Sequence, residues 1–346
     1  MNYIRSKFFI IFIIPVIAIL FILIISLSGW VNHLDSNQPL ALDAPVLGSG
    51  SRPVAVMVEN SFAARPQSGL ILADVVFEVV DEYGITRFIA IYNSNDAPVV
   101  GPVRSARPYY AEIARGFDPI YAFFGTYPEC YKAIEDMGMY VLSAMSDRSG
   151  NSSITGLAPY WRDWNRSSIQ EHTAFMSVVQ LKEKAEQIGY PLEGGGIPFS
   201  YKMDAPEAER GNITNIHVDF STHAYAPRGF DIKYIYNRSG NYYLRYMGGY
   251  PHVDYNTNQQ ITVKNIVVMI TDILGPLDKY GHMDIRTIGS GPAFFFQDGK
   301  AIQGSWQRGS TFEPYLFRDS SGKVVSFNAG STWIAIVQGA EKVSFQ

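Results

Sequence analysis

The 346-residue sequence has only one cysteine, Cys130, and charged side chains make up only 17% of it. A single cysteine excludes an intrachain disulfide framework and a cysteine-rich structural zinc site. A typical soluble globular chain carries about 25% charged residues, so part of this chain is unusually apolar. Because aromatic residues amount to 14% and are spread along the chain, collagenous, coiled-coil and wholly disordered classes are also excluded.

The first 30 residues contain much of the apolar excess. Residues 8–32 have no acidic or basic side chain, and a helix over residues 8–27 would span about 30 Å, the thickness of a bilayer's hydrocarbon core. Arg5 and Lys7 precede it, and basic residues favour the cytoplasmic side of a membrane. We therefore predict a cytoplasmic tail (1–7), a single-pass transmembrane signal-anchor (8–30) that contacts the lipid bilayer through residues 8–27, and an extracytoplasmic remainder. A cleaved signal peptide is the alternative.

The rest of the chain is mildly acidic, with 26 basic and 32 acidic side chains after residue 30. This balance argues against nucleic acid as the main partner, because binding to a phosphate backbone needs clustered positive charge. Residues 31–50 contain turn formers without apolar periodicity, which indicates a linker.

Short apolar runs alternate with helical patterns over residues 51–190, which predicts an α+β domain with layered strands and helices. The predicted strands are 54–58, 75–80, 87–92 and 120–124, and the predicted helices are 108–115, 128–137 and 174–188. Residues 191–211 have the composition of an interdomain connection. Turn residues separate eight further predicted strands in a mostly antiparallel β-rich domain over residues 212–346: 213–220, 232–236, 242–247, 266–271, 293–297, 315–318, 324–327 and 332–337.

Polar side chains cluster between residues 59 and 107. The segment 101–107 directly precedes a predicted helix, whose N-terminal amides attract anions, and its two arginines and one serine add further donors. A carboxylate such as Glu78 among valines is costly unless it is paired. We therefore predict a ligand-binding set of Glu59, Asn60, Arg65, Glu78, Glu82, Arg87, Arg104, Ser105 and Arg107. A structural ion network between the arginines and Glu78, Asp81 or Glu82 is equally compatible with the pattern.

Other polar patterns are less specific. Three His-x-Asp pairs begin at His217, His252 and His282, and we interpret them as structural pairs rather than metal ligands or acid/base groups. His172, in a Glu-His-Thr run, and Cys130, at a predicted helix start, are weak candidates for reactive groups. The sequence has no nucleophile elbow and no phosphate-binding loop, and we expect no metal and no cofactor.

Longer motifs point to a family. The runs RPVAVMVEN (52–60), ARPQSGL (64–70), GITR (84–87) and GPVRSAR (101–107) resemble the N-terminal domain of the YerB-like bacterial lipoproteins, and GSGPA (289–293) and GSTWI (330–334) resemble their C-terminal domain. The resemblance implies an extracytoplasmic two-domain envelope protein with a layered β-β-α first domain, and it implies no reaction. Trp30 stands where the lipidated cysteine of such lipoproteins would be, so the resemblance does not supply a lipid anchor here.

These features favour a membrane-anchored cell-envelope protein of unknown activity that binds an anionic or glycan ligand, such as a cell-wall polymer. Two alternatives stay open. One is a hydrolase of such a polymer with Glu78 or Glu82 as general acid or base, and the other is a non-catalytic assembly scaffold of the envelope. The sequence leaves enzymatic activity open and favours its absence.

Overall fold

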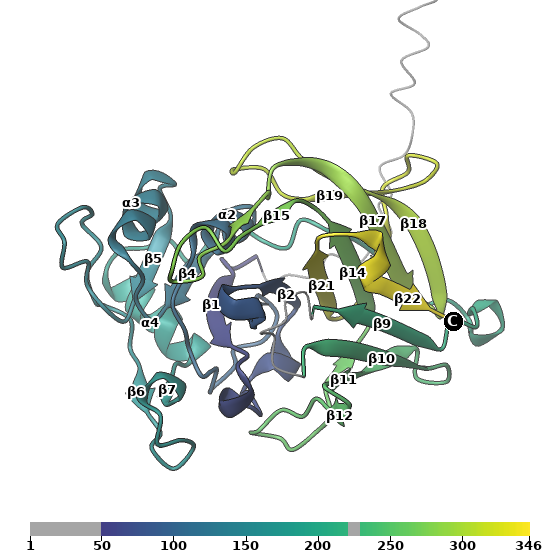
Figure 1. Cartoon of the computed structure of the whole chain (residues 1–346), viewed down its shortest axis with the longest axis horizontal. Coiled ribbons are helices and arrows are strands. Elements are labelled where there is room, and N and C mark those ends of the chain that lie inside the picture. Colours follow the sequence, from purple (N-terminus) through teal and green to yellow (C-terminus); the bar gives the residue numbers. More distant parts are fainter. Residues whose placement is uncertain (1–49, 221–228) are drawn as a thin grey trace, which may run out of the picture. The chain divides into compact units, whose positions relative to one another are not determined.

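The apolar runs of both halves of the chain become neighbouring strands of one mixed sheet (Figure 1). The structure, a computed structural model, describes residues 50–220 and 229–346. The sheet has ten strands in the order β19 (Leu316–Asp319), β18 (Lys300–Arg308), β17 (Gly289–Gln297), β14 (Asn265–Ile270), β21 (Thr332–Val337), β2 (Val75–Val80), β3 (Thr86–Tyr92), β1 (Val54–Glu59), β4 (Ile120–Phe123) and β5 (Tyr140–Ser143).

The two halves of the chain join where β21 pairs with β2. The pairing is parallel, with Val75 opposite Thr332 and Val79 opposite Ile336. On its other edge β21 is also parallel to β14, and all of its residues are buried, as is usual for strands covered on both faces. Strand β21 therefore departs from the antiparallel pairing expected for the C-terminal half and makes both halves parts of one sheet.

Three α-helices lie within the described residues: α2 (Pro108–Arg115), α3 (Pro128–Asp136) and α4 (Val178–Gln187). Proline occupies the first turn of α2 and α3, where its missing N–H costs nothing. The helices cover opposite faces of the sheet near β1: Ala55 and Met57 pack into the core that includes α2 and α3, whereas Val56 and its neighbours pack with α4.

A second, antiparallel sheet covers the α4 face of the large sheet, and Figure 1 shows it beside β14 and β21. Its order is β12 (Tyr250–Pro251), β11 (Tyr242–Met247), β10 (Asp231–Asn237), β9 (Asn215–Asp219) and β22 (Val343–Phe345), with β13 (Thr262–Val263) paired to β11. Three two-stranded pairs complete the strands: β15 (Ile273–Leu274) with β16 (Asp284–Ile285), β8 (Ser200–Lys202) with β20 (Ser326–Asn328), and β6 (Trp161–Arg162) with β7 (Ala174–Phe175).

The α+β class is thus confirmed. The predicted interdomain connection, residues 191–211, contains β8, which pairs with β20 near the C-terminus. The predicted tail, anchor and nearly all of the linker lie outside the described residues. No helix in residues 50–220 and 229–346 is long and apolar enough to cross a membrane.

Candidate functional site

A cavity of about 650 Å³ opens at one end of three central strands of the large sheet, where β1 and β2 end and β3 begins. These three ends meet because β3 is antiparallel to both of its neighbours. The lining is rich in ionisable and aromatic side chains, which include Glu59, Asp81, Glu82, Tyr83, Arg87, Arg104, Arg107, Tyr127, His172, Tyr280 and His282. Five of the predicted binding residues are therefore brought together here: Glu59, Glu82, Arg87, Arg104 and Arg107.

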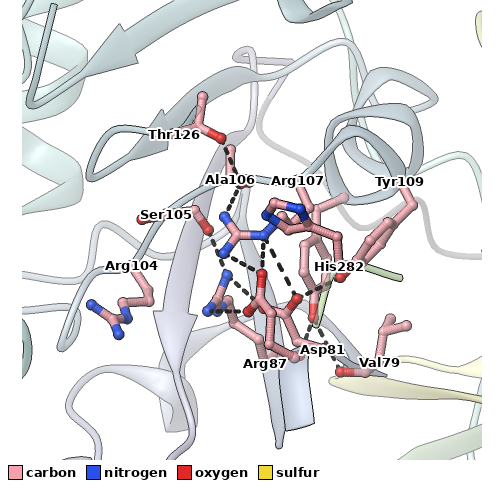
Figure 2. Close-up of polar contacts among 12 residues, drawn as sticks. Val79, Asp81, Arg87, Arg104, Ser105, Ala106, Arg107, Tyr109, Thr126 and His282 are labelled. Carbon is pink, nitrogen blue, oxygen red and sulfur yellow. Dashed lines mark hydrogen bonds and ion pairs between the residues drawn. The ribbon is translucent and has the colours of Figure 1, made fainter. Parts of the chain in front are cut away.

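Four of the lining residues form an ion cluster, which consists of Asp81, Glu82, Arg87 and Arg107. Arg87 Nη1 lies 2.6 Å from an Asp81 oxygen, and Arg87 Nη2 lies 3.4 Å from Glu82. Arg107 contacts Glu82 closely and lies 3.8 Å from Asp81. Figure 2 shows Asp81 between the two guanidinium groups, with the Tyr109 hydroxyl donating to it at 2.6 Å. Each charge of this cluster therefore faces opposite charge within it.

The cluster separates the pKa values of its two carboxyl groups. Burial alone would raise the pKa of Asp81, but Arg87, Arg107 and the Tyr109 hydroxyl hold the pKa below its ordinary value. Burial raises the pKa of Glu82, and the neighbouring Asp81 charge raises that pKa further, which the arginines offset only in part. Glu82 is thus the carboxyl group of the cluster that takes up a proton first as the pH falls.

A second group of lining residues surrounds Glu59, and we call it the Arg104 subsite: Glu59, Ser61, Arg104 and His172. Arg104 Nε lies 2.5 Å from a carboxylate oxygen of Glu59, and the Ser61 amide donates to the other oxygen at 2.9 Å. Burial would raise the pKa of Glu59, but Arg87, Arg104 and this amide lower it below its ordinary value. Burial also lowers the pKa of His172, which keeps its imidazole neutral at pH 7.

The Arg104 subsite holds polar atoms that its own protein contacts do not satisfy. Among the described residues, Ser61 Oγ and His172 Nδ1 are buried without a hydrogen-bond partner, and the terminal nitrogens of Arg104 donate to no side chain or carbonyl. The Arg104 side chain is 30% exposed, and Figure 2 shows it apart from the ion cluster. This contrast distinguishes the Arg104 subsite from the ion cluster beside it, in which the terminal nitrogens of Arg87 and Arg107 contact carboxylate or carbonyl oxygens.

The C-terminal half closes one side of the cavity with the loop between β15 and β16. His282 lies against Tyr127, with ring centroids 4.7 Å apart, and its Nδ1 is 2.7 Å from Asp278. The backbone of Gly281 approaches Glu82 so closely that a Cβ there would lie 3.3 Å from the Glu82 Cβ. Its positive φ of 83° also favours glycine. The loop is therefore fitted to the turn that carries Glu82.

Glu78 lies elsewhere, in a buried network between the two halves of the chain. This Glu78 network consists of Glu78, Arg245, His252, Gln67, Asn60 and Thr86. Arg245 Nη2 donates to Glu78 at 2.5 Å, and the Thr86 hydroxyl donates to the other Glu78 oxygen at 2.8 Å. Glu78 and Arg245 are 2% and 0% exposed, so neither charge can be solvated by bulk water.

The hydrogen bonds of the Glu78 network fix the protonation of His252. Arg245 can only donate, so its contact makes His252 Nδ1 an acceptor, and His252 Nε2 donates to Gln67 Oε1 at 3.0 Å. Burial and the nearby Arg245 hold the pKa of His252 well below its ordinary value, in agreement with a neutral ring. Gln67 in turn donates to the Glu59 carbonyl at 3.0 Å and to Asn60 Oδ1 at 2.8 Å. The network therefore holds the backbone at the cavity's edge.

Two further predicted residues, Arg65 and Ser105, make backbone contacts near the cavity. Arg65 donates to the carbonyls of Asn60 and Gly229 at 3.0 and 2.9 Å, and the Ser105 carbonyl accepts from Arg87 at 3.0 Å.

Burial raises the pKa of the Cys130 thiol to about 12, which leaves it protonated and unreactive at pH 7. No group of three or more potential metal ligands occurs in the part of the chain that the structure describes.

Sequence reasoning left several lining residues out of the predicted set: Asp81, Tyr127, His172, Tyr280 and His282. Asp81 and His172 were visible as polar residues near the predicted set. Tyr280 and His282 come from a loop about 200 positions away along the chain, and no local pattern indicates that this loop meets the turn after β2.

Comparison with known proteins accounts for both halves of the chain. Residues 44–191 match the N-terminal domain, and residues 217–334 the C-terminal domain, of a family described as "Protein of unknown function (DUF3048)". A Bacillus subtilis (strain 168) protein described as "Putative lipoprotein YerB" is 30% identical over 338 residues, which are 95% of this chain and 96% of that protein. The chain belongs to the YerB-like DUF3048 family.

The family membership expected from the motifs is thereby confirmed. The crystal structure of the YerB protein from Bacillus subtilis matches this chain with a TM-score of 0.72 at 30% identity, and the match covers 86% of this chain and 94% of that one. Both DUF3048 domains line the cavity, because Tyr280 and His282 lie in the C-terminal match and the other lining residues lie in the N-terminal match. The family description names no activity.

Proposed function

We propose that this DUF3048 protein is anchored in the membrane by residues 8–30 and binds an anionic or glycan ligand of the bacterial cell envelope in the cavity. The relative described as a lipoprotein supports an extracytoplasmic, membrane-associated location, and the length and apolarity of residues 8–30 support an anchor. The single observation that supports binding best is Arg104, which lines the cavity with terminal nitrogens that lack partners among the described residues. A guanidinium with free donors in a concave site is a common means of holding an anion.

The expected test result is a loss of binding in the variant Arg104→Ala/Arg107→Ala. Hydrogen bonds to charged groups contribute about 1.5–3 kcal/mol, so the dissociation constant for anionic wall fragments should rise by roughly tenfold or more. The measurement is calorimetric titration of purified wall fragments into the full chain in detergent. Circular dichroism verifies folding, and Arg104→Ala alone serves as the milder variant, because Glu59 keeps its backbone hydrogen bonds there.

A matched control removes two exposed cations away from the cavity, in the variant Lys132→Ala/Arg148→Ala. Its net charge equals that of the double variant, so it separates a local site from general attraction between a polyanion and the protein. Equal weakening in both variants, or unchanged binding in the folded Arg104→Ala/Arg107→Ala variant, would contradict the proposed site and favour the scaffold alternative.

One observation favours hydrolysis as a second candidate function. The paired carboxyl groups Asp81 and Glu82 have pKa values displaced in opposite directions, which is how enzymes assign acid and base roles to neighbouring carboxyl groups. Glu82 would then act as the general acid. Shortened products among the fragments after the same titration, absent with Glu82→Gln although binding is retained, would establish this function, and binding without any shortened product would exclude it for the fragments tested.

A further inference from the structure

The charges that line the cavity limit the ligands it can hold. Three carboxyl groups, Glu59, Asp81 and Glu82, face three arginines, Arg87, Arg104 and Arg107, so the lining is formally balanced when all six are ionised. His172 is neutral, and His282 is paired with Asp278 at 2.7 Å. Among anionic ligands, one with a single negative charge upsets this balance least, because Arg104 is the lining arginine with free terminal nitrogens and a dianion would add a second charge without another such guanidinium.

Arg104 also determines the shape of the preferred anionic group. Its Nε contacts Glu59, which leaves both terminal nitrogens available as a planar pair of donors. A carboxylate matches such a pair with two parallel hydrogen bonds. Arg87 and Arg107 offer no such pair, because their guanidinium groups face Asp81 and Glu82 and donate to the carbonyls of Ser105 and Ala106 at 3.0 and 2.6 Å.

Neutral polar atoms lie beside Arg104. Ser61 Oγ and His172 Nδ1 line the same cavity, are buried, and have no hydrogen-bond partner among the described residues. His172 is only 8% exposed. Buried polar groups of this kind cost about 1–3 kcal/mol each when unpaired, so a ligand with several hydroxyl groups gains affinity by pairing with them.

Aromatic rings complete the lining on the side of the C-terminal loop. Tyr83 and Tyr280 are each 60% exposed, and Tyr127 lies between Arg107 and His282. Exposed aromatic rings in a cavity provide apolar surface together with a polar hydroxyl group, which suits the mixed apolar and hydroxylated faces of a sugar ring.

We infer that the cavity holds a sugar carboxylate, a hydroxylated ring with one carboxylate that pairs with Arg104 and with hydroxyl groups that reach Ser61 and His172. The inference rests on the proposed function and narrows its ligand class from any anionic or glycan group to a sugar acid. It excludes a phosphate ester as the preferred group, because the second charge of a phosphate dianion would find no further guanidinium with free donors in this cavity.

The test compares three probes on the full chain in detergent: glucuronate, glucose and glucose 6-phosphate. Binding is followed by NMR titration at pH 8, where the phosphate ester is a dianion. We expect glucuronate to bind at least about tenfold more tightly than glucose, which corresponds to about 1.4 kcal/mol, and more tightly than glucose 6-phosphate. Equal or tighter binding of glucose 6-phosphate, or no binding of glucuronate, overturns the inference.

Two variants locate the carboxylate and the hydroxyl groups. Arg104→Lys keeps the charge but removes the planar pair of donors, and it should weaken glucuronate by about tenfold while glucose changes little. Ser61→Ala should weaken glucuronate and glucose alike by severalfold. Unchanged glucuronate affinity in a folded Arg104→Lys variant contradicts the assigned role of Arg104.

The two proposals can fail separately. If wall fragments bind in an Arg104-dependent way but glucuronate does not bind, the proposed function survives and the sugar carboxylate is wrong. If neither wall fragments nor glucuronate bind, the proposed function itself fails.

Discussion

Replacement of Arg245 by methionine is expected to lower the free energy of unfolding by about 3–5 kcal/mol. Arg245 and Glu78 are 0% and 2% exposed and lie 2.5 Å apart. The variant leaves the Glu78 carboxylate buried with only the neutral donors Thr86 and Asn60, and a buried charge without a countercharge is costly. Because Glu78 belongs to the N-terminal domain and Arg245 to the C-terminal one, the loss should appear in one cooperative unfolding transition measured by urea denaturation.

The double variant Arg245→Met/Glu78→Leu separates two effects. One is the cost of leaving Glu78 buried without its partner, and the other is the net contribution of the ion pair to stability. Replacing both partners by apolar groups is often nearly neutral, so we expect the double variant to recover most of the lost free energy. Lys132→Met, which removes one partner of an exposed pair on α3, should have no measurable effect. If Arg245→Met unfolds at the same urea concentration as the parent, the Glu78 network does not join the two halves.

Stability is expected to fall as the pH drops from about 6.5 toward 5, by up to about 1.4 kcal/mol per pH unit through His252. In the folded protein burial, Arg245 and Arg65 hold the pKa of His252 well below its ordinary value of 6.5. Below pH 6.5 His252 therefore binds a proton in the unfolded chain but not in the native state. The contribution of His252 is fully present above pH 6.5 and is lost as the pH falls through this window.

The variant His252→Gln isolates this effect, because glutamine can keep one acceptor and one donor toward Arg245 and Gln67. Other groups with displaced pKa values remain in both proteins. Glu82, whose raised pKa favours the native state as the pH falls, acts in the opposite direction, and His172, whose pKa is lowered, acts in the same direction. The difference in slope between the two proteins therefore reports His252, and parallel slopes would show that His252 is charged in the native state.

Local sequence patterns are sufficient to predict an element whose structure depends on its own residues. Strand β2 and helix α2 have the predicted bounds, 75–80 and 108–115, because valines bounded by turns and a proline at the first helical position are local signals. No local pattern predicts strand β18 (Lys300–Arg308). Its residues alternate between exposed, half-buried and buried positions without a run of branched apolar side chains, and its pairing partners β17 and β19 rather than its own composition make it a strand.

Contacts between segments that are distant in the sequence determine the features that local patterns do not predict. The predicted polar set separates into the cavity and the Glu78 network because Arg245, on a strand of the second sheet, reaches Glu78, and no spacing within residues 59–107 indicates that partner. The pairing of β2 with β21 joins segments more than 250 positions apart. For the same reason the sequence could predict Glu82 and Arg104 as polar residues of interest but could not predict that Tyr280 and His282 close the cavity around them.

The histidine rings offer a direct way to locate a ligand bound in the cavity. The cavity is lined by His172 and His282, whereas His217 lies on β9 in the second sheet and is 44% exposed in its side chain. Anionic wall fragments are added to the full chain in detergent, and long-range nitrogen–proton NMR spectra of the imidazoles are recorded. We expect the signals of His172 and His282 to shift with saturation while that of His217 stays fixed. Binding that shifts neither His172 nor His282 would place the ligand elsewhere and contradict binding in the cavity.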